Sequence, residues 1–313
     1  MGVYMKKFIR DIILISLLTV LSLLGIFFAI QSIPPQFSDT YDAAVLDKYQ
    51  RLISIKSPKM ILIAGSNFAF GIDSEKLQDA FEMPVVNLGL HAGIKPHFTL
   101  AMAKENIQEG DIIVIGIEYG EYYKRQIDVP TLLTTVENYS DLWKFVSITD
   151  YPRIFKGYVS DYGTLKIDRY LHGAEPSQGV YARASFNEFG DIEYERPANE
   201  RTDYEATVEI LSDKISGSLI KELNQFNQYA QKQGAKVYLT FPSLDEATVI
   251  SNEEERKDFV ATLEKQLDFP IISNMEDYIM PSELFYNSDY HLNEEGREIR
   301  TTKLIQDLKE MLD

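Results

Sequence analysis

The first thirty residues contain the longest apolar run of the chain. Residues 12–30, IILISLLTVLSLLGIFFAI, are nineteen positions without a charged side chain. As a helix rising about 1.5 Å per residue, this run covers roughly the 30 Å hydrocarbon core of a bilayer. We therefore predict a membrane-spanning helix through which the chain contacts the bilayer, and the rest of the sequence has no second run long enough to span.

The charges on the two sides of this run differ in sign. Basic residues precede it and the first charges after it are acidic (Lys6, Lys7 and Arg10 before; Asp39 and Asp42 after). The positive-inside rule then makes residues 1–33 a cytoplasmic tip and anchor and places the rest outside the cytoplasmic membrane. The alternative is a cleaved signal peptide, whose apolar region is usually about 7–15 residues and ends in small residues. The apolar run here is longer, and the sequence at its end, FAIQSIPPQ, is a poor cleavage site, which favours an uncleaved anchor.

Beyond a predicted stalk at 34–57, strand-like and helix-like patterns alternate. Short apolar runs predict strands at 59–65, 84–90, 111–117, 235–242 and 270–273. Amphipathic runs predict helices at 74–81, 96–108, 207–233, 253–266 and 293–312, the last with Asn293 as N-cap. This order predicts an α/β domain over 58–313, with a doubly wound, largely parallel five-stranded sheet and helices on both faces.

The alternation is interrupted at about 119–204. These 86 residues lack clear periodicity and contain 11 of the 19 tyrosines and the only tryptophan, Trp143. A segment this long without secondary structure is uncommon in a compact domain and is usually functional. We interpret it as an inserted cap, in which the tyrosines either pack the cap or stack on sugar rings.

Composition narrows the possible functions. The net charge is −17, which argues against nucleic acid as a partner because binding phosphates requires clustered Lys and Arg. Cysteine is absent, so disulfides, Cys-ligated metals and a thiol nucleophile are excluded. The four histidines are scattered without a ligand spacing. We expect neither a metal nor another cofactor.

Candidate catalytic residues follow the predicted strands. In open α/β sheets ligands bind at the carboxyl ends of the strands. Ser66 follows the first strand, and Asp289 and His291 precede the last helix. A serine hydroxyl becomes an effective nucleophile when an imidazole takes its proton, and an acid orients that imidazole. We predict Ser66 as nucleophile, His291 as base and Asp289 as its partner, with Asn287 or Glu118 as alternatives for the last role.

Other polar residues at the same edge are candidates for an oxyanion hole or for substrate binding. The backbone N–H of Gly89 is a candidate oxyanion donor because no side chain blocks it. Further candidates are Asn67, Asn87, His91 and Glu118. His91 has an equally good interpretation as an ordinary loop histidine.

These motifs resemble the SGNH (GDSL-type) hydrolase superfamily. The resemblance is carried by Gly65-Ser66-Asn67, by Asn87-x-Gly89 and by an acid-x-His before the last helix. It covers residues 61–312 without the insertion and implies a flavodoxin-like three-layer sandwich. An N-terminal membrane helix before such a domain is similar to the membrane-anchored bacterial branch, which includes alginate acetylation factors and the D-alanine transfer protein of teichoic acid synthesis. These proteins often accompany a membrane-bound O-acyltransferase and modify surface or secreted polymers.

The sequence also departs from the family pattern. The first block lacks the Asp of Gly-Asp-Ser, and the third block, Gly116-Ile117-Glu118-Tyr119, lacks the Asn that usually serves as an oxyanion donor. The usual acid lies three residues before His, where this chain has Ser288. The Asp-x-His spacing resembles that of the alginate acetylation factors, and the departures point away from a generic secreted lipase.

Three functions remain open from the sequence. The first is a membrane-anchored O-acyltransferase that passes an acyl group to a polysaccharide acceptor, with a membrane-bound O-acyltransferase as partner. The second is a carbohydrate esterase with the same triad. The third is a non-catalytic module that binds glycan or scaffolds a partner. The anchor favours transfer, because it holds the site beside a donor delivered through the bilayer.

Overall fold

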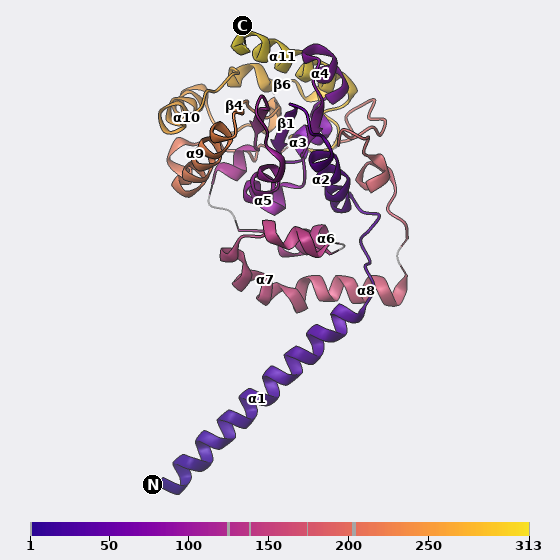
Figure 1. Ribbon diagram of the computed structural model, residues 1–313, viewed down its shortest axis with the longest axis vertical. Helices are drawn as coiled ribbons and strands as arrows, with labels where there is room; N and C mark the ends of the chain where they lie inside the picture. The colour runs from indigo at the N-terminus through magenta and orange to yellow at the C-terminus, as the bar shows by residue number, and fades with distance from the viewer. Residues whose placement is uncertain (1, 124–125, 138, 174, 202–204, 313) are drawn as a thin grey trace.

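The computed structural model describes residues 2–123, 126–137, 139–173, 175–201 and 205–312. Helix α1 (Gly2–Ser32) projects from one end of the folded domain (Figure 1). Its segment Tyr4–Ser32 is long and apolar enough to cross a membrane. Residues 202–204, where the predicted insertion ends, lie outside the described part of the chain.

A parallel sheet forms the centre of the domain. Its strands lie in the order β2-β1-β3-β4, with bounds β1 Met60–Ala64, β2 Val85–Asn87, β3 Ile112–Gly116 and β4 Lys236–Leu239. Ile61 pairs with Ile113, and Val114 with Tyr238. The predicted parallel α/β arrangement is therefore confirmed.

Four of the five predicted strands form this sheet in the described part of the chain, whereas the 270–273 segment makes a single bridge, Ile271 to Leu239. On one side of the bridge, Pro270 has no N–H to donate to a neighbouring strand. On the other side, the backbone N–H of Phe241 donates to the Ser273 hydroxyl at 3.1 Å and not to a backbone carbonyl of this segment. A separate small parallel pair is formed by β5 (Leu244–Asp245) and β6 (Ile279–Met280).

Alternate strand residues face two different cores. Met60 and Leu62 face α4 (Ser74–Phe81) and α11 (Glu294–Leu312). Ile61 and Ile63 face the larger core, which includes side chains of four helices: α2 (Val45–Ser54), α5 (Lys95–Ala103), α9 (Gly217–Lys232) and α10 (Glu253–Gln266). The strands are buried on both faces, which explains their uninterrupted apolar runs.

Two predicted segments differ from the structure in detail. Helix α9 begins at Gly217 instead of 207, because Val208 is extended and forms a bridge with Val249. Part of the predicted stalk forms α2, whose Val45, Leu46 and Leu52 are buried in the larger core.

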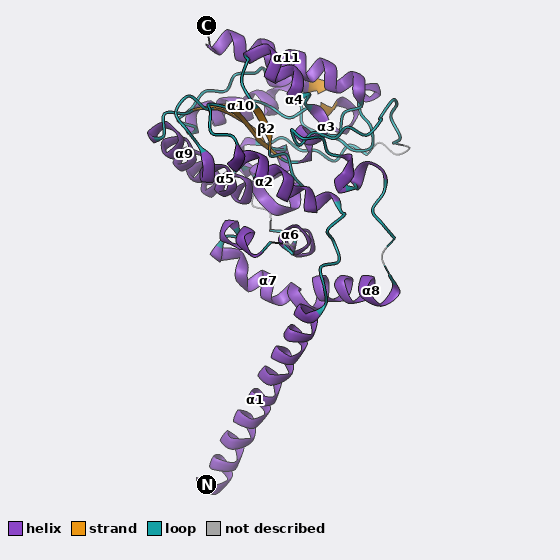
Figure 2. Cartoon of the chain, turned by 45° about the vertical axis from the view of Figure 1, so that its right-hand side comes forward, coloured by secondary structure: helices purple, strands orange, loops and turns teal. Residues whose placement is uncertain are grey.

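The insertion contains helices that the sequence pattern did not indicate. They are α6 (Val129–Val136), α7 (Tyr151–Gly157) and α8 (Thr164–His172), with a π-helical turn at Tyr158–Gly163 joining the last two. Figures 1 and 2 show them between the sheet domain and α1, with α7 and α8 running across the end of α1. The insertion therefore forms a layer between α1 and the sheet.

Candidate active site

The candidate site lies where the strand order reverses. From β1 the chain crosses to β2 on one side, and β3 lies on the other side of β1. Such a switch point leaves a crevice at the carboxyl ends of the two central strands. Ser66, the first residue of the short helix α3 (Ser66–Gly71), follows β1, and Glu118 follows β3. The two side chains meet there, with Ser66 Oγ 3.3 Å from Glu118 Oε1.

The structure brings Ser66 and His291 into hydrogen-bond contact. Ser66 Oγ lies 2.8 Å from His291 Nε2, and His291 Nδ1 lies 2.9 Å from Asn287 Oδ1. The Asn287 amide nitrogen donates to the Tyr181 hydroxyl, 2.9 Å away, so its oxygen faces the ring. In this arrangement Nδ1–H donates to Asn287 and Nε2 accepts the Ser66 proton, as a general base requires.

Asp289, the predicted partner of His291, lies elsewhere. Its carboxylate forms an ion pair with Arg201, with 2.7 Å between Oδ1 and Nη1. The turn before α11 separates the two candidates: Ser288 Oγ accepts the N–H of His291 at 3.1 Å, which places Asn287 and His291 on the same side. The contact expected of Asp289 is made by Asn287, which the sequence offered only as an alternative.

His291 is held neutral by its surroundings. The imidazole is buried and stacks on Phe70, with 3.8 Å between ring centroids and 2° between planes. Burial, with smaller contributions from the positive charge of Arg196 and from His91, lowers the pKa of His291 from 6.5 to about 3. The ring is therefore available as a proton acceptor over almost the whole pH range in which proteins are stable.

Glu118 occupies the space beside Ser66. Its Oε1 accepts the backbone N–H of Asn67 at 3.3 Å. Gly65 leaves room for this carboxyl group, because a Cβ at that position would lie 2.7 Å from the same oxygen and would displace it. Burial raises the pKa of Glu118 above its ordinary value, although the hydrogen bonds that Asn67 donates oppose this. The environment thus favours a neutral carboxyl group more than a surface position would.

Asn87 and Gly89 form hydrogen bonds that hold the local backbone in place. The Asn87 amide nitrogen donates to the carbonyl of Phe68, 2.9 Å away, and its oxygen accepts the Gly89 N–H, also at 2.9 Å. The Gly89 N–H thus points to Asn87, which does not match its expected role as an oxyanion donor. Gly89 is nevertheless required, since a Cβ there would lie 2.8 Å from the backbone nitrogen of Ala69.

The remaining sequence candidates are Asn67 and His91. The Asn67 side chain is buried and donates to the Gly116 carbonyl at 3.0 Å, which ties α3 to β3. Among the described residues its Oδ1 has no hydrogen-bond partner. His91 is exposed on the loop after β2, and its Nδ1 accepts the Gly93 N–H at 3.0 Å. It is close enough to influence the pKa of both Glu118 and His291.

Three residues of the site were not predicted from the sequence. Phe70 stacks on His291, Tyr181 orients Asn287, and buried Arg196 donates to the carbonyls of Leu292 and Phe70 at 3.1 and 3.3 Å. Phe70 follows Ser66 by four residues on α3, so helical spacing was a signal for it. Tyr181 and Arg196 come from the segment between α8 and α9, and no local pattern marks them.

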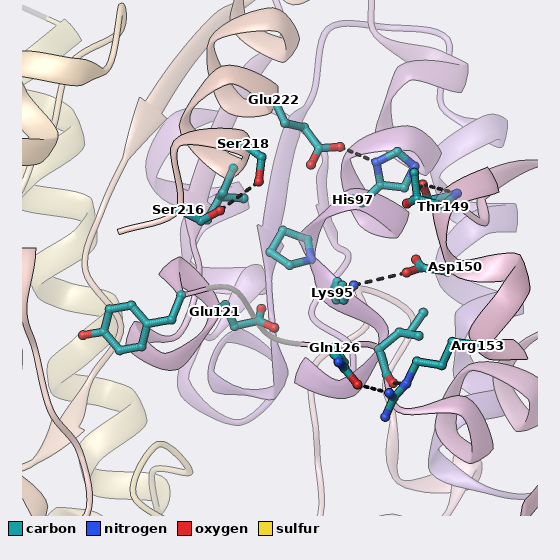
Figure 3. A pocket seen from close by; sticks show the side chains of 15 residues that line it. Lys95, His97, Glu121, Gln126, Thr149, Asp150, Arg153, Ser216, Ser218 and Glu222 are labelled. Carbon is teal, nitrogen blue, oxygen red and sulfur yellow. Dashed lines mark hydrogen bonds and ion pairs between the residues drawn. The ribbon is translucent and has the colours of Figure 1, made fainter. Parts of the chain in front are cut away.

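A polar cavity of about 630 Å³ lies near the same loops (Figure 3). It is lined by residues that follow β2 and β3, by the start of α9 and by the insertion, but not by Ser66, Asn287 or His291. Lys95 Nζ lies 3.2 Å from Asp150, and His97 contacts Glu222. The lining therefore offers hydrogen-bond donors and acceptors together, with charges of both signs.

The cavity and the Ser66 site share one turn. The N–H of Glu121, which lines the cavity, donates to the carbonyl of Glu118 at 2.8 Å. Lys95, on another wall, has a φ of +62°, a conformation that residues with a side chain rarely adopt. Backbone strain of this kind often occurs at functional sites.

Comparisons with known proteins add no family assignment. No family model matches the chain, and no curated protein is significantly similar to it. Among the described residues, no group of three or more His, Asp or Glu side chains is arranged to hold a metal ion. The geometry around Ser66 is therefore the main guide to function.

Proposed function

We propose that the protein is a membrane-anchored serine O-acyltransferase of SGNH type, which acts outside the cytoplasmic membrane on a polysaccharide. The observation that carries the proposal is the chain of contacts from Ser66 through His291 to Asn287, with 2.8 and 2.9 Å between the paired atoms. A hydroxyl, a neutral imidazole and an oriented acceptor at a strand-end crevice form the arrangement that nucleophilic catalysis needs.

In the first step Ser66 Oγ attacks the carbonyl carbon of the acyl donor, and its proton moves to His291 Nε2. The tetrahedral intermediate collapses, and the leaving oxygen takes that proton, which leaves an acyl ester on Ser66. A sugar hydroxyl then attacks this ester and gives its proton to Nε2. When the new ester leaves, the proton returns to Ser66 Oγ and the enzyme is regenerated.

Glu118 is the proposed oxyanion donor. An ionised carboxylate beside Ser66 would repel the negative charge that develops on the carbonyl oxygen. A neutral carboxyl group donates a hydrogen bond instead, and burial favours that form of Glu118. A buried acid kept neutral to donate in this way is an established device in enzymes. Glu118 would thus replace the Asn that the third block of this chain lacks.

One feature supports transfer to sugar over hydrolysis: α1 would hold the site near a donor handed over by a membrane-bound O-acyltransferase partner. The polar cavity, whose paired donors and acceptors suit the hydroxyl groups of a glycan, supports a glycan as the substrate in either case. The alternative, a carbohydrate esterase, uses the same residues with water as the acceptor.

The test uses the full chain in detergent or vesicles with p-nitrophenyl acetate. We expect an acetyl group on Ser66 that mass spectrometry locates. Both Ser66→Ala and His291→Ala should lower the rate by roughly 10³-fold or more. Ser54→Ala is the matched control, since Ser54 is exposed at the end of α2 and its hydroxyl donates to the carbonyl of Arg51, away from both His291 and the cavity lining. A glycan acceptor should divert acetyl from water to sugar in a transferase and leave its release to water unchanged in an esterase.

Absence of turnover in this assay, together with normal polymer modification by Ser66→Ala in cells, would overturn the catalytic proposal. The third candidate, a module that binds glycan or scaffolds a membrane partner, would then replace it.

A further inference from the structure

An apolar groove runs between α1 and the insertion. It has a volume of about 790 Å³, within the range of about 300–1,000 Å³ that is typical of ligand pockets. One wall is α1, from Val20 to Gln31, and the other comes from α7 and its neighbours. The main apolar residues that line it are Leu23, Leu24 and Phe27 on one side and Trp143, Tyr151 and Phe155 on the other.

The groove is open and its side chains are exposed. Phe155 is 75% exposed and Tyr151 is 47% exposed. Aromatic and apolar residues exposed together are unusual on a surface that faces water. They are common at the level of lipid headgroups, where Trp and Tyr are enriched. Lys156 lines the same groove and among the described residues forms no ion pair, so its ammonium group is available to a phosphate.

The two walls are held together at the end of α1. Ile30 is 1% exposed and lies against Gly163, where a Cβ would approach it to 2.6 Å. The Gln31 side chain donates to the Tyr158 hydroxyl at 2.8 Å, and the Phe27 and Tyr158 rings are 5.0 Å apart. The angle between α1 and α7, seen in Figure 2, is thus fixed by packing at this corner.

The position of the groove relates it to a bilayer. The α1 wall extends about 16 Å along the helix at 1.5 Å per residue, close to the depth of one leaflet, about half of the 30 Å hydrocarbon core. The rod formed by α7, the π-helical turn and α8 runs across the end of α1 (Figure 1), where the apolar helix would leave the bilayer. The apolar surface of the groove therefore continues the lipid-facing surface of α1 up to the headgroup level.

We propose that the groove is a phospholipid site, in which one acyl chain from the leaflet on the side of the folded domain lies between α1 and α7. The phosphate of that lipid lies near Lys156. The insertion thereby rests on the membrane surface and fixes the height and tilt of the domain above it. The proposal depends on α1 crossing the bilayer, and it does not depend on the chemistry at Ser66.

The unaltered chain contains its own reporter, because Trp143 is the only tryptophan and lines the groove. The full chain is reconstituted in vesicles of phosphatidylcholine with or without bromine atoms on the acyl chains. Bromine quenches tryptophan fluorescence on contact. We expect Trp143 emission to fall in brominated vesicles, most with bromines near the headgroup. Ser66→Ala should be quenched equally, which separates this result from any failure of the proposed catalysis.

The absence of cysteine allows a second measurement with single spin labels. A nitroxide is placed on Phe155→Cys and, as the matched control, on Ile250→Cys. Ile250 is also apolar and exposed, and it lies three residues before α10, a helix that Figure 1 shows away from α1. We expect the label at 155 to meet oxygen, which concentrates in lipid, more than a water-soluble nickel chelate. The label at 250 should show the reverse.

Three results would overturn the proposal. Equal access of the nickel chelate to both labels, with no bromine quenching, would mean that the groove lies in water. Shielding of the label at 155 from both reagents, with spin–spin broadening, would mean that a second copy fills it. The same shielding without broadening in native membranes would mean that another protein covers it.

Discussion

The amide oxygen of Asn287 lies 2.9 Å from Nδ1 of His291, the position that a carboxylate occupies in a Ser-His-Asp triad. The contact fixes the tautomer of the imidazole as a carboxylate would. It adds no negative charge to stabilise the imidazolium that forms during catalysis, and this agrees with a pKa of His291 near 3. Asn287 thus orients the imidazole of His291, the proposed base, without raising its pKa.

This relationship predicts a clear difference between two neighbouring residues. Asn287→Ala should lower the rate with p-nitrophenyl acetate by roughly 10²-fold or more, because the ring loses its orienting contact. Asp289→Asn should leave the rate close to that of the wild type, because Asp289 pairs with Arg201 and not with His291. A large loss in Asp289→Asn together with a small one in Asn287→Ala would reverse this assignment.

Asn287→Asp should move the acid limb of the pH–rate profile. A carboxylate at 287 would stabilise the charged imidazole and raise the pKa of His291. The rate should then begin to fall at a higher pH on acidification than in the wild type, where the fall is expected near pH 3. An acid limb that stays in place would show that Asn287 does not contact the ring during catalysis.

Glu118→Gln tests the proposed role of Glu118 as oxyanion donor, and its effect is expected on the alkaline limb of the pH–rate profile. Glu118 donates only while it is protonated, so the rate should decline as the pH rises through its elevated pKa. A glutamine amide donates at every pH, so this decline should disappear in Glu118→Gln while His291 still sets the acid limb. Rates are measured at the wavelength where the two forms of nitrophenol absorb equally. A wild-type rate that rises through the same titration would show that the ionised carboxylate is the active form.

The central sheet was predictable because its strands are buried on both faces. Runs such as 60–64 and 112–116 are entirely buried, and nothing but a buried strand or a buried helix turn gives such a pattern. Ser66 and His291 could be placed together because strand ends meet at one edge. Whether Asn287 or Asp289 contacts His291 could not be predicted, because Asp289 pairs with Arg201. Arg201 lies far away in sequence, and no local pattern relates it to this turn.

The helices of the insertion were not predicted, for a different reason. Between Tyr158 and Gly163 the chain forms a π-helical turn, which adds a residue and shifts the phase of the apolar face. The pattern of α7 therefore does not continue in α8, although the two form one rod. Part of their apolar surface also remains exposed, as at Phe155. Apolar residues therefore occur on exposed as well as buried faces, and the sequence does not show the usual amphipathic pattern of a helix.

The buried ion pair between Lys59 and Asp111 should matter strongly for stability. Both side chains are fully buried with 2.9 Å between the charged atoms, and Asp111 also accepts the backbone N–H of Lys59. Lys59→Met leaves the carboxylate without its cation, so unfolding should become easier by about 3–5 kcal/mol. The matched control is Lys257→Met, whose partner Glu253 is exposed to water, so that its loss should leave the stability nearly unchanged. Denaturant titration in detergent measures both, and similar losses would contradict this account.

The orientation of the anchor is the last expectation that can be tested directly. Lys6, Lys7 and Arg10, in the first turns of α1 before its apolar run, should keep the N-terminus in the cytoplasm, so that Ser66 and His291 face the outside, where surface polymers are modified. Protease added to intact bacterial spheroplasts should then degrade the domain after α1, while a cytoplasmic marker stays intact. Because orientation depends on these charges, replacing all three with Glu should protect part of the population. Full protection of the unaltered protein would place the site in the cytoplasm and remove the surface polysaccharide as its acceptor.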